Sequence, residues 1–198
     1  MLNGGAGIDR LIGGAGNDTY VVDVREDRGV GNGGGGGDTG LSSATLHELD
    51  PNVENLTLIT GGVSGWGNAL NNVIRGNSSD NVLNGLTGAD TLIGGAGNDT
   101  YLVDGLGDRV VENAGEGVDS VQSTASHTLA ANVENLLLTE IFATNGTGNA
   151  LNNIIIGNDA ANSLSGLDGN DRLAGVGGND TLLGGNGNDR LEGGTGND

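Results

Sequence analysis

One large apolar residue recurs every nine positions along much of the chain, after a six-residue stretch rich in glycine and aspartate. Blocks such as GGAGNDTYV (13–21) and GLTGADTLI (85–93) have glycine first and fourth, aspartate sixth and a large apolar residue eighth. One apolar position in nine is too sparse for the apolar stripe of a helix, and so much glycine destabilises helices. The eighth-place residues are Leu11, Tyr20, Ile74, Leu83, Leu92, Tyr101, Val110, Ile155, Leu164, Leu173, Leu182 and Leu191.

Each block predicts a tight turn followed by a short strand. The residues around the apolar position are compatible with β-structure, and glycine accepts the positive φ angles of tight turns. Two blocks then form one coil of about 18 residues, with strands of successive coils paired about 4.8 Å apart. We therefore expect an all-β protein, a parallel β-solenoid whose eighth-place side chains stack inside.

A longer repeat lies over the nonapeptide. LIGGAGNDTYVVD (11–23) returns as LIGGAGNDTYLVD (92–104), and GNALNNVIRGN (67–77) returns at the same offset as GNALNNIIIGN (148–158). NVENL (52–56) returns at 132–136, one position short of that offset. Because the register persists, we expect a single repeat solenoid over 1–198. It contains regular blocks at 1–41, 67–122 and 148–198, with less regular stretches at 42–66 and 123–147.

The two less regular stretches show strand-like alternation around the NVENL copies. We interpret 42–66 and 123–147 as wider coils of the same solenoid, and a separate linker is the alternative. We expect Trp66 and Phe142 to fill the core of these wider coils. His47 and His127 stand alone and are expected at surface or strand positions.

The composition excludes several classes of protein. Of the charged residues 26 are acidic and 7 basic, which gives a net charge of −19 and argues against nucleic-acid binding. There is no cysteine for disulfides or thiolate sites, and no apolar run long enough to span a membrane as a helix. With 42 glycines and 2% aromatic residues, apolar burial alone is too small to hold such a chain folded.

The sixth-place aspartates offer the missing stabilisation. Coiling places these carboxylates above one another, and a divalent cation between them would turn repulsion into attraction. Oxygen ligands without cysteine favour a hard cation, and Ca²⁺ accepts carboxylates together with the carbonyls of a flexible turn. We therefore expect several bound Ca²⁺ ions.

The motif GGxGxDxUx resembles the haemolysin-type calcium-binding repeat, also called repeats-in-toxin (RTX). The resemblance implies a right-handed parallel β-roll with Ca²⁺ between turns of successive coils, in a bacterial protein exported by type I secretion. The expected carboxylate ligands are Asp9, Asp18, Asp27, Asp90, Asp99, Asp108, Asp171, Asp180, Asp189 and Asp198. The expected glycines of the sites are Gly4, Gly7, Gly13, Gly16, Gly85, Gly88, Gly94, Gly97, Gly166, Gly169, Gly175, Gly178, Gly184, Gly187, Gly193 and Gly196.

In such a roll a site joins blocks two apart on one edge. This predicts four full pairs: Asp9 with Asp27, Asp90 with Asp108, Asp171 with Asp189, and Asp180 with Asp198. Asp18 and Asp99 face slipped blocks, in which Asp38 and Asp119 come two places late, so partial or distorted sites are expected there. Asn72, Asn81, Asn153 and Asn162 replace the aspartate and are expected to continue the solenoid through amide hydrogen bonds without metal.

The expected function is that of a secreted, extracellular calcium-binding module without catalysis, which folds on binding Ca²⁺. There is no HExxH motif, and Ser64 in GVSGW lacks the second glycine of a nucleophile elbow. One alternative is a structural segment of a bacterial adhesin or surface-layer protein. Another is the C-terminal part of a secreted protease, lipase or polysaccharide-modifying enzyme. Because Met1 leads directly into a repeat and Asp198 stops within one, we expect a fragment, with self-association or neighbouring domains as further partners.

Overall fold

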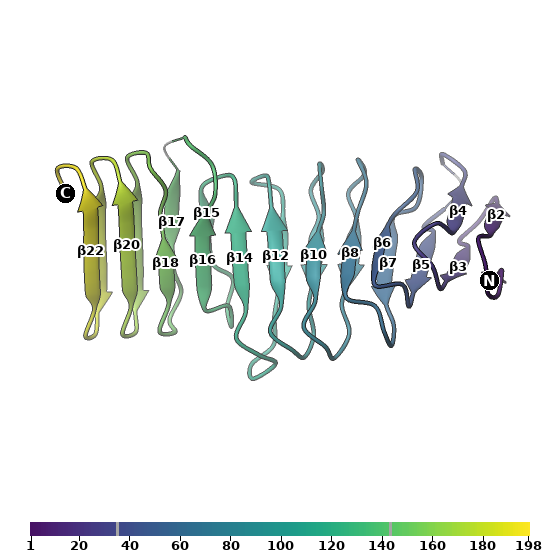
Figure 1. The fold of residues 1–198 in the computed structure, drawn as a ribbon, viewed down its shortest axis with the longest axis horizontal. Helices are drawn as coiled ribbons and strands as arrows, with labels where there is room; N and C mark the ends of the chain where they lie inside the picture. Colours follow the sequence, from purple (N-terminus) through teal and green to yellow (C-terminus); the bar gives the residue numbers. More distant parts are fainter. Residues whose placement is uncertain (35, 143) are drawn as a thin grey trace.

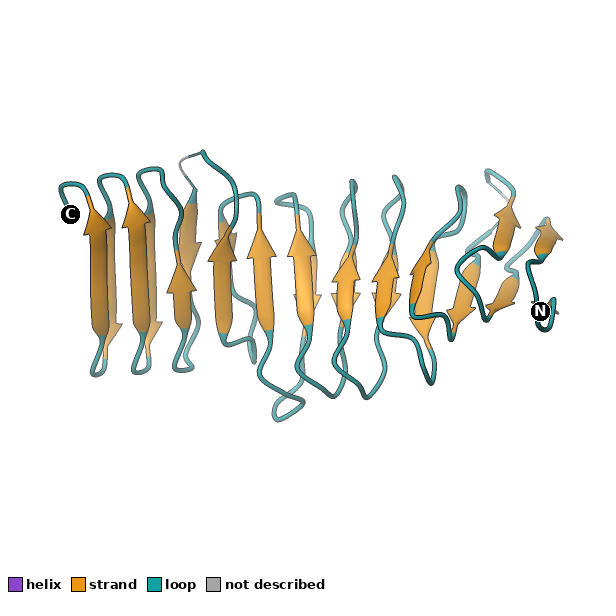
Figure 2. Ribbon diagram, in the orientation of Figure 1, coloured by secondary structure: helices purple, strands orange, loops and turns teal. Residues whose placement is uncertain are grey.

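The nonapeptide period becomes, in the computed structural model, a stack of short parallel strands along one long axis (Figure 1). The structure describes residues 1–34, 36–142 and 144–198, and in these ranges it contains 22 strands and no helix (Figure 2). Leu92 lies opposite Ile74 on one neighbouring strand and Val110 on the other, so one coil uses two nonapeptides. The predicted parallel solenoid is confirmed. Position 35 of the first regular block and position 143 of the stretch 123–147 lie outside the described residues.

Each coil places one strand on each of two faces. Odd-numbered strands form a seven-stranded sheet of β1 (Leu2–Asn3), β3 (Thr19–Val22), β5 (Thr39–Ser42), β7 (Asn55–Leu58), β9 (Val73–Arg75), β11 (Thr91–Ile93) and β13 (Arg109–Val111). A four-stranded sheet follows, with β15 (His127–Thr128), β17 (Asn145–Thr147), β19 (Ser163–Asp168) and β21 (Thr181–Asn186).

Even-numbered strands also form two sheets. The first pairs β2 (Arg10–Gly14) with β4 (Arg28–Gly31). The second has nine strands: β6 (Leu46–Glu48), β8 (Ser64–Trp66), β10 (Val82–Asn84), β12 (Thr100–Val103), β14 (Ser120–Ser123), β16 (Asn135–Leu138), β18 (Ile154–Ile156), β20 (Arg172–Gly177) and β22 (Arg190–Thr195).

The core is a narrow column between the two faces. Most eighth-place side chains point into it, and Tyr20, Ile74 and Tyr101 are fully buried. The pattern ends at the last coil, where Leu182 is only partly buried and Leu191 is 46% exposed because β22 is an edge strand. The column is only as wide as two facing side chains, so the turns must contribute a large share of the stability.

The stretches 42–66 and 123–147 are continuous with the solenoid. Thr39 pairs with Asn55 and Ser120 pairs with Asn135, and both steps along the chain are shorter than two nonapeptides. The later steps from His127 to Gly146 and from Asn135 to Ile154 are longer than two nonapeptides. Their strands therefore join the sheets on either side with irregular sequence spacing. The prediction that Phe142 fills the core is wrong, since its side chain is 67% exposed.

Three other positions also differ from expectation. Trp66 is only partly buried, because its neighbour Gly65 takes the inward position on β8. His47 is buried and lies opposite Gly65 on the neighbouring strand. His127 is partly buried and lies opposite Gly146, so both histidines are at strand positions that face the inside of the solenoid. The surface part of that expectation is wrong, and the facing glycines explain how the imidazoles fit.

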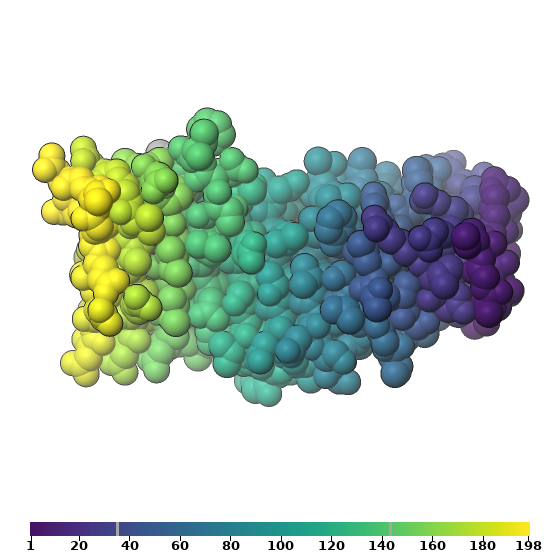
Figure 3. All heavy atoms as spheres, in the orientation of Figure 1, coloured from purple at the N-terminus to yellow at the C-terminus, as the bar shows by residue number. Residues whose placement is uncertain are grey.

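The two copies of the long repeat begin on opposite faces of the solenoid. Because its length equals nine nonapeptides, an odd number, the second copy starts on the opposite face: Tyr20 is on β3 and its counterpart Tyr101 is on β12. Sheet pairing is interrupted at corresponding places, between β4 and β6 on one face and between β13 and β15 on the other. The result is an elongated rod (Figure 3). None of the described segments is a helix that could cross a membrane.

Candidate metal centres

The predicted aspartates lie in the turns at the two edges of the solenoid, where consecutive coils hold them one above another. In each predicted pair, the backbone N–H of one aspartate donates to the carboxylate of the aspartate one coil further on. These bonds join Asp9 to Asp27 (2.9 Å), Asp18 to Asp38 (2.9 Å), Asp90 to Asp108 (3.0 Å), Asp99 to Asp119 (2.8 Å), Asp171 to Asp189 (3.0 Å) and Asp180 to Asp198 (2.9 Å).

The slipped blocks keep this arrangement. Asp38 and Asp119 accept the same backbone bond at nearly the same distance as the regular pairs, although each lies two places late in the sequence. The extra residues are absorbed within the turn, so the carboxylate keeps its place in the column. The distortion expected for these two pairs is absent from this contact.

The eight GGxGxD stretches, called aspartate turns below, share one backbone conformation. They begin at Gly4, Gly13, Gly85, Gly94, Gly166, Gly175, Gly184 and Gly193. Their fourth-place glycines all have positive φ: Gly7, Gly16, Gly88, Gly97, Gly169, Gly178, Gly187 and Gly196. The second place is also positive, even where it is Leu86, Leu167 or Val176, which L-residues adopt at a cost.

The first glycine is required for a different reason. A Cβ on Gly85 would collide with Oδ2 of Asp90, and a Cβ on Gly94 would collide with Oδ2 of Asp99. The carboxylate folds back over the first residue of its own turn and occupies the space that a side chain would take. The spacing of the motif thus fixes both the bend and the position of the charged group.

One carboxylate oxygen in each of the six pairs has no hydrogen-bond partner among the described residues. These buried oxygens are Oδ2 of Asp9, Asp18, Asp90, Asp99, Asp171 and Asp180, the first member of every pair. A buried polar atom without a partner costs free energy, and more so when it carries charge. A hard cation bound to these oxygens would remove that cost, so the residues present fit Ca²⁺.

The pKa values of these aspartates are those of buried carboxylates that lack a compensating positive charge. Burial, together with the neighbouring charge of Asp108, raises the pKa of Asp90 to about 6, against a lowering contribution from the Asn72 N–H. Burial and the charge of Asp119 likewise raise the pKa of Asp99 to about 6. The pKa of Asp171 is raised as well, mainly by burial. A bound cation would favour the charged form and reverse these shifts.

Four further turns, called asparagine turns below, have asparagine in place of the sixth-place aspartate and a different backbone conformation. They read GNxxxN at 67–72, 76–81, 148–153 and 157–162, and none of their residues has positive φ. In the first, Asn68 N–H donates to Oδ1 of Asn72 (2.8 Å), so the acceptor oxygen is used within the turn. The Nδ2 group of Asn72 donates to the carbonyls of Val53 (3.3 Å) and Glu54 (3.2 Å) on the preceding coil. The amide hydrogen bonds expected of these blocks are confirmed.

Two sets of residues at these edges were not predicted from the sequence. The second-place asparagines bridge to the preceding coil, as when Asn68 donates to the carbonyls of Asp50 (2.9 Å) and Val53 (2.8 Å). The glutamates of the NVENL copies continue the carboxylate columns, since Asp38 N–H bonds Glu54 and Asp119 N–H bonds Glu134. The recurrence of GN and NVENL was the available signal.

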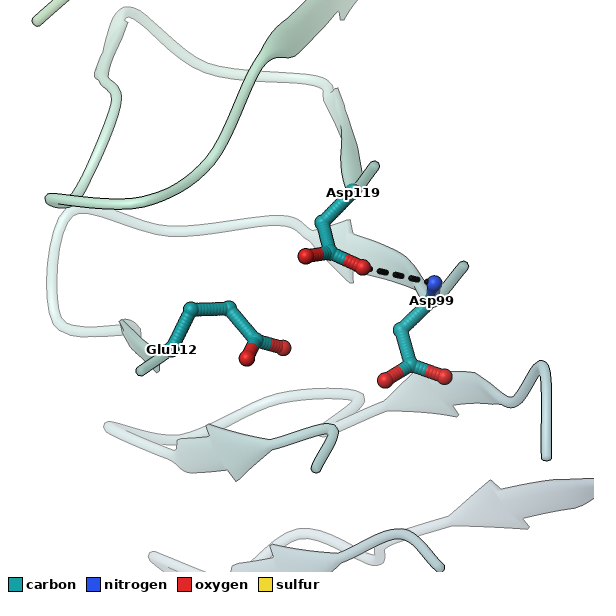
Figure 4. A group of neighbouring side chains, drawn as sticks. All are labelled: Asp99, Glu112 and Asp119. Carbon is teal, nitrogen blue, oxygen red and sulfur yellow. Dashed lines mark hydrogen bonds between the residues drawn. The ribbon is translucent and has the colours of Figure 1, made fainter. Parts of the chain in front are cut away.

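Glu112 is a third unpredicted residue. It is buried beside Asp99 and Asp119, and it accepts a hydrogen bond from the Tyr101 hydroxyl (Figure 4). Burial and the charges of Asp119 and Asp99 raise the pKa of Glu112 to about 8. In the first copy the corresponding tyrosine, Tyr20, donates instead to Asp38 (3.2 Å).

Comparison with protein families gives one match. The family model described as the RTX calcium-binding nonapeptide repeat matches four copies, at residues 1–23, 66–101, 147–182 and 165–198. The matches cover more than half of the chain and include all six aspartates with an unpaired Oδ2. A search of curated proteins found no match to the chain.

Proposed function

The chain belongs to the family of RTX calcium-binding nonapeptide repeats, and on that basis we propose that it is a secreted module that folds on binding Ca²⁺ outside the cell and has no catalysis of its own. Six buried aspartate oxygens without a hydrogen-bond partner among the described residues carry this proposal. Each belongs to an aspartate that is paired with an aspartate of the next coil. A cation bound there would join the coils that the charges otherwise push apart.

The ligands that we assign to these sites are the six aspartate pairs and the turns around them. Asp27 and Asp108 differ from the others because backbone N–H groups of their own turns already bond their second oxygen, as Asp23 N–H does for Asp27 (3.0 Å). The first aspartate of each pair therefore supplies the oxygen most in need of a cation. The glycine turns supply carbonyls that no side chain shields.

Calcium concentration would set the stability of the module. With a Kd of about 10⁻⁴ M, 1 mM Ca²⁺ adds about 1.4 kcal/mol per site, and submicromolar Ca²⁺ adds almost nothing. Six such sites would add about 8 kcal/mol, which is comparable with the whole stability of a domain. The chain would then stay unfolded at cytosolic calcium levels and become rigid outside the cell, which favours an extracellular, bacterial location.

Calcium titration of the full chain tests the proposal. We expect isothermal calorimetry to give about six Ca²⁺ per chain and far-ultraviolet circular dichroism to lose its β-sheet signal in excess EGTA. A calorimetric count of zero, or an unchanged spectrum after chelation, would refute the calcium-dependent module.

A structural role in a bacterial adhesin or surface-layer protein is the second candidate. It is favoured by the elongated rod and by the long repeat, which can be extended without changing the register (Figure 3). An increase in molar mass on adding calcium, measured by light scattering, would support this role. A monomer at all calcium concentrations would count against it.

A further inference from the structure

Glu112 occupies a position that the aspartate turns reserve for glycine. It begins its nonapeptide, one long repeat after Gly31, which holds the same place in the first copy. Its side chain is 7% exposed, and Oε2 has no hydrogen-bond partner among the residues that the structure describes. Only Oε1 is engaged, by the hydroxyl of Tyr101. A buried carboxylate has thus been added where the first copy has none.

The added carboxylate points toward one of the six aspartate pairs. Single carboxylate oxygens of Asp99, Glu112 and Asp119 lie within 4.8 Å of one another, and all three residues are buried (Figure 4). Oδ2 of Asp99 and Oε2 of Glu112 are both unpaired among the described residues. Three buried carboxylates at this spacing repel one another strongly unless a proton or a cation neutralises part of their charge.

We propose that Glu112 is a third carboxylate ligand of the cation held by Asp99 and Asp119. This rests on the proposed function, because it assumes that the aspartate pairs bind Ca²⁺. The extra charge makes this the tightest of the six sites and the one that most favours a trivalent ion, since calcium affinity follows the charge of the ligands. The site would therefore fill first as calcium rises.

The repeat provides a matched control. The Asp18–Asp38 pair has the same turn, the same slipped partner and a tyrosine, but Gly31 in place of Glu112. Tyr20 donates to Asp38 and Tyr101 to Glu112, and the chain has 2 tyrosines, so each tyrosine reports on one site. Tb³⁺, a trivalent oxygen-binding ion, emits when a nearby tyrosine is excited.

The experiment compares the two sites by Tb³⁺ luminescence. W66F/Y20F leaves Tyr101 as the reporter, and W66F/Y101F leaves Tyr20. We expect the Tyr101 site to reach half-saturation at a Tb³⁺ concentration about tenfold lower than the Tyr20 site, because ligand charge sets affinity. Equal midpoints, or a tighter Tyr20 site, would overturn the proposal. This comparison leaves Glu112 itself unchanged.

E112Q in each background then isolates the carboxylate. Glutamine keeps the size and an acceptor for Tyr101, so we expect the Tyr101 midpoint to rise about tenfold through the lost charge and the Tyr20 midpoint to stay constant. An unchanged Tyr101 midpoint would mean that Glu112 only anchors Tyr101. If E112Q does not fold, the comparison of the two sites with Glu112 intact decides. A calorimetric count near six with equal midpoints rejects this inference alone, and a count of zero rejects the proposed function.

Discussion

The aspartate turns and the asparagine turns solve the same problem with different chemistry. Both must hold the edge of one coil against the next while the strands between them stay in register. The asparagine turn does this with its own amides: Asn72 and Asn68 donate to carbonyls of the preceding coil, and their polar atoms have partners. The aspartate turn leaves an oxygen such as Asp90 Oδ2 unpaired and raises the pKa of that carboxyl. The asparagine turn thus pairs its polar atoms with the chain itself, whereas the aspartate turn leaves a buried oxygen that fits a cation.

Under the proposed function, this comparison indicates where along the chain folding would depend on calcium. Asparagine turns occupy 67–81 and 148–162, and each pair is followed along the chain by aspartate turns. Coils joined by amide hydrogen bonds thus adjoin coils that carry the proposed cation sites. A strand that forms on calcium binding would then have a folded neighbour with which to pair.

Chelation should have the largest effect and should separate the two kinds of turn. We expect hydrogen exchange in EGTA to increase most in the aspartate turns 85–99 and 166–180, and least in the asparagine turns 67–81 and 148–162. The reason is the loss of about 1.4 kcal/mol per site at 1 mM Ca²⁺. Exchange followed by mass spectrometry measures this, and equal loss of protection in both kinds of turn would remove the distinction.

Asn72→Ala tests the amide linkage. The substitution removes the acceptor for Asn68 N–H and two donors to the preceding coil. We expect about 2–3 kcal/mol of lost stability, by the cost of buried groups left unpaired, in both calcium and EGTA. Chemical denaturation measures the change. Asn113→Ala, at an exposed side chain bonded to Glu116, is the control, and rescue of Asn72→Ala by calcium would contradict the interpretation.

The effect of Asp90→Asn on the free energy of unfolding should have opposite signs with and without calcium. Asparagine keeps an acceptor for Asn72 N–H but removes the buried charge. We expect a loss of about 1.4 kcal/mol in 1 mM Ca²⁺, because one site disappears, and equal or greater stability in EGTA. Paired denaturation curves measure this. Asp80→Asn makes the same charge change at an exposed side chain and should leave the calcium count unchanged. Destabilisation of Asp90→Asn in EGTA would contradict the metal assignment.

Acid should weaken calcium binding while favouring the metal-free fold. Because the pKa of Asp90 and of Asp99 is raised to about 6, these groups bind protons more tightly when folded than when unfolded. Their contribution to the metal-free fold is therefore complete below about pH 4 and is lost as the pH rises through 6. Calcium must displace these protons, so its affinity should fall about tenfold per pH unit below 6 for each proton displaced. Calorimetric titration at pH 7 and pH 5 measures this, and an unchanged affinity would exclude these two carboxylates as ligands.

The sequence predicted the fold and the pairing of the aspartates because a strict period leaves few degrees of freedom. Nine residues with one apolar position fix the strand, and glycine at the first and fourth places fixes the turn, so the pairs such as Asp90 and Asp108 meet as expected. Asp38 and Asp119 show the limit: the period breaks there, and the structure absorbs the extra residues in the turn.

What the sequence could not supply were contacts made across coils by residues outside the motif. Glu54 reaches the column through a longer side chain, and Glu112 turns inward from a position that should hold glycine. Phe142 is exposed because it falls in the turn between β16 and β17 and not at an inward position of a strand. Such contacts depend on which residues lie side by side on neighbouring coils. That arrangement follows from the lengths of the irregular coils, which only the structure gives.

The direct test is a crystal structure of the full chain grown in millimolar Ca²⁺, with anomalous difference density recorded at long wavelength. Six peaks are expected, each beside Oδ2 of Asp9, Asp18, Asp90, Asp99, Asp171 or Asp180, with no peak at the asparagine turns. Absence of density at these oxygens, or equal density at both kinds of turn, would contradict the assignment of calcium to the aspartate turns.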